Sequence, residues 1–201
     1  MLKKMNWQFL LILCLVTLFA GCGTKVTRMD VEEGKDLSGR WNDTDSRLVA
    51  EEMIKDCLER PWLNQYNMKT GKVPDVIVGN IANRSAEHIS TETFIKDLER
   101  SLLNSGKVRF VASAGERQGI RSEREDQAIN ATADSANAPR QEAGADFMLI
   151  GSINSIIDRE KKRQVVFYQV DLELIDMADN RKVWIGNKKI KKFVERSKFG
   201  Y

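Results

Sequence analysis

The sequence of 201 residues contains a single histidine, His88, with only three cysteines and three prolines. One histidine cannot complete a Ser/His/Asp or Cys/His relay, and so few cysteines give neither a disulfide framework nor a zinc site. Gly115 and Gly119 are not followed by the Gly-Lys-Ser/Thr of a phosphate-binding loop. We therefore expect no catalytic site, no cofactor and no metal, and we place His88 in a loop.

The sequence also lacks a strong excess of one charge. It has 32 Lys and Arg residues against 29 Asp and Glu residues, a formal net charge of +3. This balance does not indicate nucleic-acid binding. Most carboxylates stand beside Lys or Arg in helical stretches, which is typical of solvated helix faces. A chain of this length suits one compact domain plus an exported leader. The composition thus favours a protein that acts by binding and is not an enzyme.

The N-terminus has the layout of an exported leader. A positive segment, Met1–Lys4, precedes an apolar run over Phe9–Ala20. The run is shorter than the about 20 apolar residues that a membrane-spanning helix needs. It ends in small residues directly before Cys22, in a segment that resembles the lipobox of bacterial lipoproteins, with Phe19 where Leu is usual. The segment is Leu18-Phe19-Ala20-Gly21-Cys22.

The lipobox resemblance implies that Cys22 carries lipid (palmitate and related acyl chains) after cleavage of the leader. Gly23, in place of Asp, implies sorting to the outer membrane, where the protein would face the periplasm. Several acyl chains on one residue anchor a protein stably, whereas a single chain does not. We expect a signal peptide over residues 1–21, a lipidated flexible tether over 22–40 and a folded domain over 41–201.

Apolar periodicity predicts alternating helices and strands, followed by three consecutive strands. The first helix is capped at Asp43 or Thr44 and ends near Pro61, the second is capped at Ser90 or Thr91, and Ser113 caps a third, polar helix. The expected strands are Asp75–Ile81, Val108–Ala112, Phe147–Ile157, Gln164–Ile175 and Val183–Ile190, with a short helix between Pro139 and Gly144.

This order predicts an α/β protein of the α+β type, with a mixed sheet, helices packed on it and a terminal β-meander. Alternate apolar residues from Val166 to Leu174 indicate that one face of the fourth strand is buried and the other is half-solvated. Cys57 fits a helical core position, and Trp41 and Trp62 are expected to cover the core.

The segment Ile77–Ile120 resembles the LpoB family of penicillin-binding protein activators. The resemblance rests on Asn83-Arg84-Ser85 after a strand, on the helix Thr91–Asn104 and on Ser105-Gly106-Lys107-Val108-Arg109-Phe110-Val111. It extends more weakly to Ala143–Leu149 and to Val183-Trp184-Ile185-Gly186.

The family resemblance implies a fold like the N-terminal domain of TolB. It also implies that the protein binds and activates a class A (bifunctional) penicillin-binding protein, and so regulates peptidoglycan synthesis, cell-wall biogenesis and cell shape. Familiar members carry a long Pro-rich linker, whereas only Gly23–Arg40 stands before this domain. The alternative is a subunit of an outer-membrane secretion or assembly complex of the curli-secretion type.

Asn83 and Arg84 are the candidate partner-binding residues. The guanidinium of Arg84 can form a bidentate pair with a partner carboxylate. Equally, both side chains can bond the local backbone and cap a turn. Two basic segments, Arg159–Arg163 and Lys188–Lys192, either shield a sheet edge or meet an acidic partner or anionic lipid. The sequence leaves these alternatives open.

Overall fold

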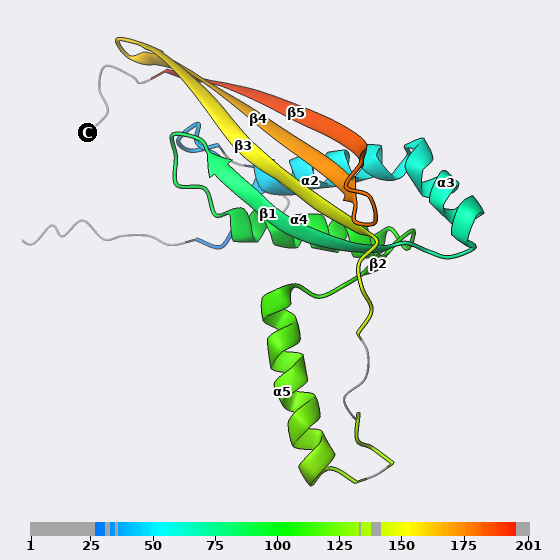
Figure 1. Ribbon diagram of the computed structural model, residues 1–201. Helices are drawn as coiled ribbons and strands as arrows, with labels where there is room; N and C mark the ends of the chain where they lie inside the picture. The colour runs from blue at the N-terminus through cyan, green and yellow to red at the C-terminus, as the bar shows by residue number, and fades with distance from the viewer. Residues whose placement is uncertain (1–26, 31–32, 35, 133, 138–141, 196–201) are drawn as a thin grey trace, which may run out of the picture. The chain divides into compact units, whose positions relative to one another are not determined.

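The computed structural model describes residues 27–30, 33–34, 36–132, 134–137 and 142–195 (Figure 1). The chain divides into two compact units, residues 1–34 and residues 35–201. All helices and strands of the described residues belong to the second unit. The leader and Cys22 lie outside the described residues.

A five-stranded mixed, curled sheet forms the framework of the second unit, in the order β2-β1-β3-β4-β5. β1 (Asp75–Arg84) pairs in parallel with β2 (Arg109–Phe110) and with β3 (Phe147–Glu160). β3, β4 (Arg163–Asp176) and β5 (Lys182–Glu195) pair antiparallel in sequence order. The α+β class and the terminal meander are therefore confirmed.

Four helices accompany the sheet in the described part of the chain: α2 (Asp43–Leu58), α3 (Pro61–Thr70), α4 (Thr91–Asn104) and α5 (Ala114–Asn130). Figure 1 shows α2, α3 and α4 on one side of the sheet. Their buried residues join the inward side chains of the strands in a single core. Val166, Tyr168 and Val170 of β4 are almost fully buried, which confirms the predicted alternation.

The predicted N-cap of the first helix was wrong by one residue. Its N-cap is Asn42, whose side chain accepts from the backbone N–H of Asp45 in a capping box. Pro61 does not merely follow this helix but begins α3, because proline is favoured in the first turn, where its missing N–H has no intrahelical partner. The predicted strand Val108–Ala112 is also wrong in length, since only Arg109 and Phe110 pair with β1.

The other helices follow the prediction more closely. Ser90 caps α4 and Ser113 caps α5, and no residue of α5 is buried. Of the short helix expected from Pro139 to Gly144, residues 138–141 lie outside the described part, and residues 142–144 are not helical.

Residues 36–41, at the end of the expected tether, lie against β5 and the core. Gly39 has a φ of 70° and passes so close to Val194 that a Cβ there would lie 2.1 Å from a methyl carbon of that valine. The indole of Trp41 packs edge-on against Phe94 and Tyr168. Lys192 of β5, whose side chain is only 9% exposed, forms ion pairs with Asp36 and Asp45.

α2 runs beside β5 and is joined to it by polar contacts at regular intervals. Asp45 pairs with Lys192, Glu52 with Lys188, and the carboxylate of Asp56 accepts from the indole N–H of Trp184 at 2.9 Å.

Within the described residues, no helix is both long enough and apolar enough to cross a bilayer.

Candidate partner-binding surface

The side of the sheet opposite α2, α3 and α4 carries no helix among the described residues, and we call it the open face (Figure 1). Strand register shows which side chains lie there. Because Val166 and Tyr168 point into the core, Val165, Phe167 and Gln169 point to the open face. Directly paired residues share a face, so each of these positions defines a row across neighbouring strands.

Three adjacent rows near the β3–β4 turn form what we call the open-face patch. Their members come from the consecutive strands β3, β4 and β5 and from β1, which lies far from them in the sequence. The rows are Arg84, Asn154, Gln169, Lys189; then Ile156, Phe167, Lys191; then Asp158, Val165, Phe193.

The patch has an apolar centre exposed to solvent. Ile156 is 67% exposed and Phe193 is 63% exposed, with half-buried Phe167 and Val165 between them. Large apolar side chains grouped on an open surface mark protein-interaction sites. Aromatic residues are also enriched among the residues that dominate interface energies.

Unpaired cations surround this centre. The side chains of Arg84, Lys189 and Lys191 make no hydrogen bond or ion pair to any described residue, and Asp158 is the one acid in the three rows. In the neighbouring row, Asp171 accepts from the amides of Gln169 and Asn154. The patch therefore offers cationic donors free to meet a partner's carboxylates.

Asn83 and Arg84 are neighbours on β1 and not residues of a loop after it, but they have separate surroundings. The amide nitrogen of Asn83 donates to the carbonyl of Glu87 at 2.8 Å, and its oxygen accepts from the backbone N–H of Ser85 at 2.9 Å. These bonds hold the turn that follows β1. Arg84 lies on the open face opposite Asn154.

The basic segment Lys188–Lys192 divides in the same way. Lys188 and Lys192 point toward α2 and pair with its carboxylates, whereas Lys189 and Lys191 lie on the open face. In the other segment, Arg159 donates to Gln164 and Arg163 pairs with Glu195. Because side chains alternate between the two faces of a strand, neighbouring cations of one segment have different surroundings and different partners.

A model of the family described as "Peptidoglycan-synthase activator LpoB" matches residues 45–190. This chain belongs to the LpoB family. Members of the LpoB family are activators and not enzymes, in agreement with the sequence interpretation.

Among solved structures, the chain is similar to the LpoB C-terminal domain from Escherichia coli, at 15% identity and a TM-score of 0.46 over 74% of this chain and 99% of that one. The Salmonella enterica LpoB C-terminal domain gives 14% identity and a TM-score of 0.45 over the same shares. The NMR structure of E. coli LpoB gives 15% identity and a TM-score of 0.42 over 88% of this chain and 83% of that one. No curated protein sequence matches the chain.

The LpoB match includes Arg84, Ile156 and Phe167 of the patch but ends before Lys191 and Phe193. The sequence placed Phe167 on the half-solvated face of its strand, but Ile156 and Phe193 were missed as surface residues. Their signal was present in the period-two pattern, because each alternates with an inward-facing neighbour. What the pattern alone does not supply is the pairing that brings them together.

The remaining residues singled out from the sequence lie elsewhere. His88 is exposed in the loop between β1 and α4. Cys57 is buried, and burial raises the pKa of its thiol to about 12, so the thiol is protonated and unreactive at neutral pH. Trp62 packs edge-on against Phe147 in the core. The described residues contain no cluster of side chains that could hold a metal ion.

Proposed function

We propose that this LpoB-family protein binds a class A, bifunctional penicillin-binding protein through the open-face patch and thereby stimulates peptidoglycan synthesis. The observation that carries the proposal is the uncovered sheet face, where exposed Ile156 and Phe193 lie among cations with no described partner. Membership of a family of synthase activators supports the choice of partner.

The energetics of the patch fit a partner that supplies both apolar surface and carboxylates. Full burial of an exposed Ile or Phe side chain is worth about 1.5–3 kcal/mol, so Ile156 and Phe193 together can provide a large share of a moderate affinity. Arg84 adds a planar, bidentate donor that recognises carboxylates with defined geometry. Lys189 and Lys191 increase the association rate with an acidic surface more than they increase the final affinity.

We further propose that lipid on Cys22 holds the protein at the periplasmic face of the outer membrane. Of the expected tether over residues 22–40, the part before Asp36 is the free connection, because residues 36–40 pack against β5. The lipobox and Gly23 support this location. Fewer than 20 residues at ~3.3–3.6 Å each span at most about 60 Å, so the synthase must be met close to the membrane.

Pull-down of the cognate class A synthase by the full-length protein in detergent tests the proposal. Arg84→Glu and Phe193→Ser should each reduce the retained synthase by about ten-fold, since each removes an interaction at the centre or rim of the patch. Stimulation of glycan-chain synthesis should fall in parallel. Thermal melting should stay unchanged, because both side chains are exposed in the free protein.

Asn83→Ala and Lys72→Glu serve as controls. Asn83→Ala should lower the melting temperature through loss of the turn and leave binding by the folded fraction intact. Lys72→Glu reverses an exposed charge outside the patch and should change neither property. Wild-type retention of the synthase by both Arg84→Glu and Phe193→Ser would contradict the proposal.

A further inference from the structure

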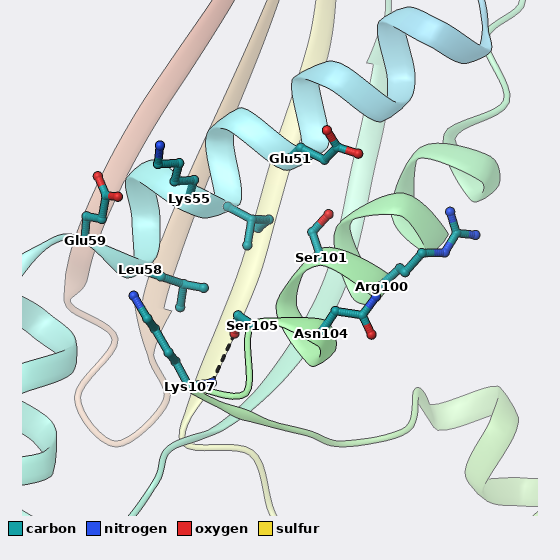
Figure 2. A pocket seen from close by; sticks show the side chains of 10 residues that line it. Glu51, Lys55, Leu58, Glu59, Arg100, Ser101, Asn104, Ser105 and Lys107 are labelled. Atoms are coloured by element: carbon teal, nitrogen blue, oxygen red, sulfur yellow. Dashed lines mark hydrogen bonds between the residues drawn. The ribbon is translucent and has the colours of Figure 1, made fainter. Parts of the chain in front are cut away.

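A groove lies on the helix side of the domain, between the C-terminal halves of α2 and α4 (Figure 2). Its volume is about 420 Å³, within the range of about 300–1,000 Å³ that is usual for small-ligand sites. It is separate from the open-face patch, with which it shares no residue.

The floor of the groove is apolar and already fixed by the core. Ile54 and Leu58 of α2 line it while being only 2% and 6% exposed. Their positions are set by packing in the core, so a ligand in contact with them loses little free energy to the ordering of side chains. Such a floor suits small alkyl side chains.

The charges around the groove leave two ammonium groups available. Glu51 is paired with Arg47, and Arg100 with Asp97. The side chains of Lys55 and Lys107 have no partner among the described residues, and Glu59 is the one lining acid in the same condition. The available charge is therefore positive, which favours a carboxylate.

Neutral polar groups complete the lining. Ser101 points into the groove from α4, and Asn104 lies at its edge (Figure 2). Neither side chain makes a hydrogen bond to a described residue. The hydroxyl of Ser105, in contrast, donates to the backbone carbonyl of Leu102 and accepts from the backbone N–H of Lys107. Ser101 and Asn104 can thus bond the amide groups of a peptide.

We propose that this groove binds the end of a short peptide, with its small alkyl side chains on Ile54 and Leu58. Its terminal carboxylate lies at Lys107 and at Lys55, whose side chain must turn toward the groove from the outward direction that Figure 2 shows. The choice of ligand rests on the proposed function. The ligand class is the free D-alanyl end of a peptidoglycan stem peptide, which presents a carboxylate beside methyl groups. The occupancy of the groove would then depend on how much uncrosslinked peptide is present.

Titration of the ¹⁵N-labelled full-length protein in detergent with N-acetyl-D-alanyl-D-alanine tests the proposal by NMR. Backbone amide shifts are expected at Lys55, Ser101 and Lys107 and not on β4 or β5. The carboxamide of the same dipeptide should bind at least about five-fold more weakly, because it lacks the charge that the lysines recognise.

Two variants test separately how the charge of the groove and its free volume contribute to peptide binding. Lys55→Glu combined with Lys107→Glu should weaken binding by about ten-fold or more, whereas Lys69→Glu combined with Lys72→Glu, outside the groove, should not. Ser101→Trp should abolish binding by filling the groove while leaving its charge unchanged.

Absence of peptide-dependent shifts, equal binding of the carboxamide, or a preference for N-acetyl-L-alanyl-L-alanine would each overturn the inference. Preference for the D-peptide supports it. The groove variants should retain the synthase in the pull-down, so failure of the peptide titration is distinguishable from failure of the proposed function.

Discussion

Lys192 of β5 bonds to α2 and to the segment before this helix, residues 36–41. Its ammonium pairs with Asp36 and Asp45 and donates to the backbone carbonyl of Arg40 at 3.2 Å. Burial acts to lower the pKa of Lys192, but the two carboxylates outweigh it and raise this pKa above its ordinary value. The stabilisation is therefore complete at neutral pH and is lost only as the pH rises through the raised pKa.

Lys192→Met should destabilise the domain by about 2–4 kcal/mol, because it leaves the largely buried carboxylate of Asp45 without its cation. Urea denaturation measures this as a lower midpoint with an unchanged slope. Lys191→Met is the matched control: this neighbour points to the open face and should change stability by less than about 0.5 kcal/mol. Equal effects of the two substitutions would contradict the assignment of Lys192 to a buried ion-pair cluster.

Residue-level roles were predictable only where local pattern decides them. Ser113 and Ser90 are caps because a short polar side chain precedes a helical stretch, and the sequence shows this directly. Asn83 and Arg84 could not be separated from the sequence, because the expected strand ended at Ile81 and therefore assigned neither residue to a face. Strand register and the turn bonds of Asn83 distinguish them, and these depend on Glu87 and on pairing with β3.

Among the elements, α5 depends on its ends and not on a buried face. None of its residues is buried. The stability of the folded helix therefore comes from its capping box and from surface ion pairs, including that of Arg121 with Glu142. Ser113→Ala should remove about 1 kcal/mol of helix stability, and hydrogen exchange across α5 should quicken about five-fold. Exchange in β4 should not change. Ser122→Ala, within the same helix, should not accelerate exchange, and uniform acceleration throughout the domain would refute local unfolding of α5.

The same capping box gives α5 a pH dependence. The ammonium of Lys96 and the backbone N–H of Ser113 hold the pKa of Glu116 down at about 2. Because the folded-state pKa is depressed, the contribution of Glu116 is complete above the unfolded carboxyl value of about 4.3 and is lost as the pH falls toward 2. Carbon-detected NMR of the Glu116 carboxyl should show this low midpoint. Lys96→Met should move the midpoint upward, and an ordinary midpoint in the unmodified protein would contradict the contacts.

Element prediction from the sequence succeeded where periodicity was long and failed where tertiary contacts decide. α4 and the three meander strands show sustained patterns, and the structure contains them. α3 was missed because it places only Trp62 and Leu63 in the core, which is too little to create a helical stripe. β2 is short because only Arg109 and Phe110 reach β1, a limit that no local pattern contains.

At the scale of the whole molecule, the open-face patch could not have been predicted from the sequence, because sheet order brings β1 beside β3 across more than one intervening element. The helix-side groove likewise requires α2 and α4 to lie together. Both surfaces belong to the folded domain, whereas the proposed lipid belongs to Cys22. Binding and membrane location should therefore be separable.

Cys22→Ala tests this separation. It should abolish incorporation of labelled palmitate and remove the protein from the outer-membrane fraction, since a peptide without acyl chains has no comparable affinity for that membrane. The purified variant should still retain the synthase in pull-down as the wild type does, because Arg84 and Phe193 are untouched. In cells, stimulation of synthesis should nevertheless fall, because a tether of fewer than 20 residues confines the domain near the membrane and its loss dilutes the local concentration. Labelling and electrophoretic mobility unchanged by Cys22→Ala would exclude lipidation at this residue, and loss of binding by the purified variant would show that the domain and its anchor are not independent.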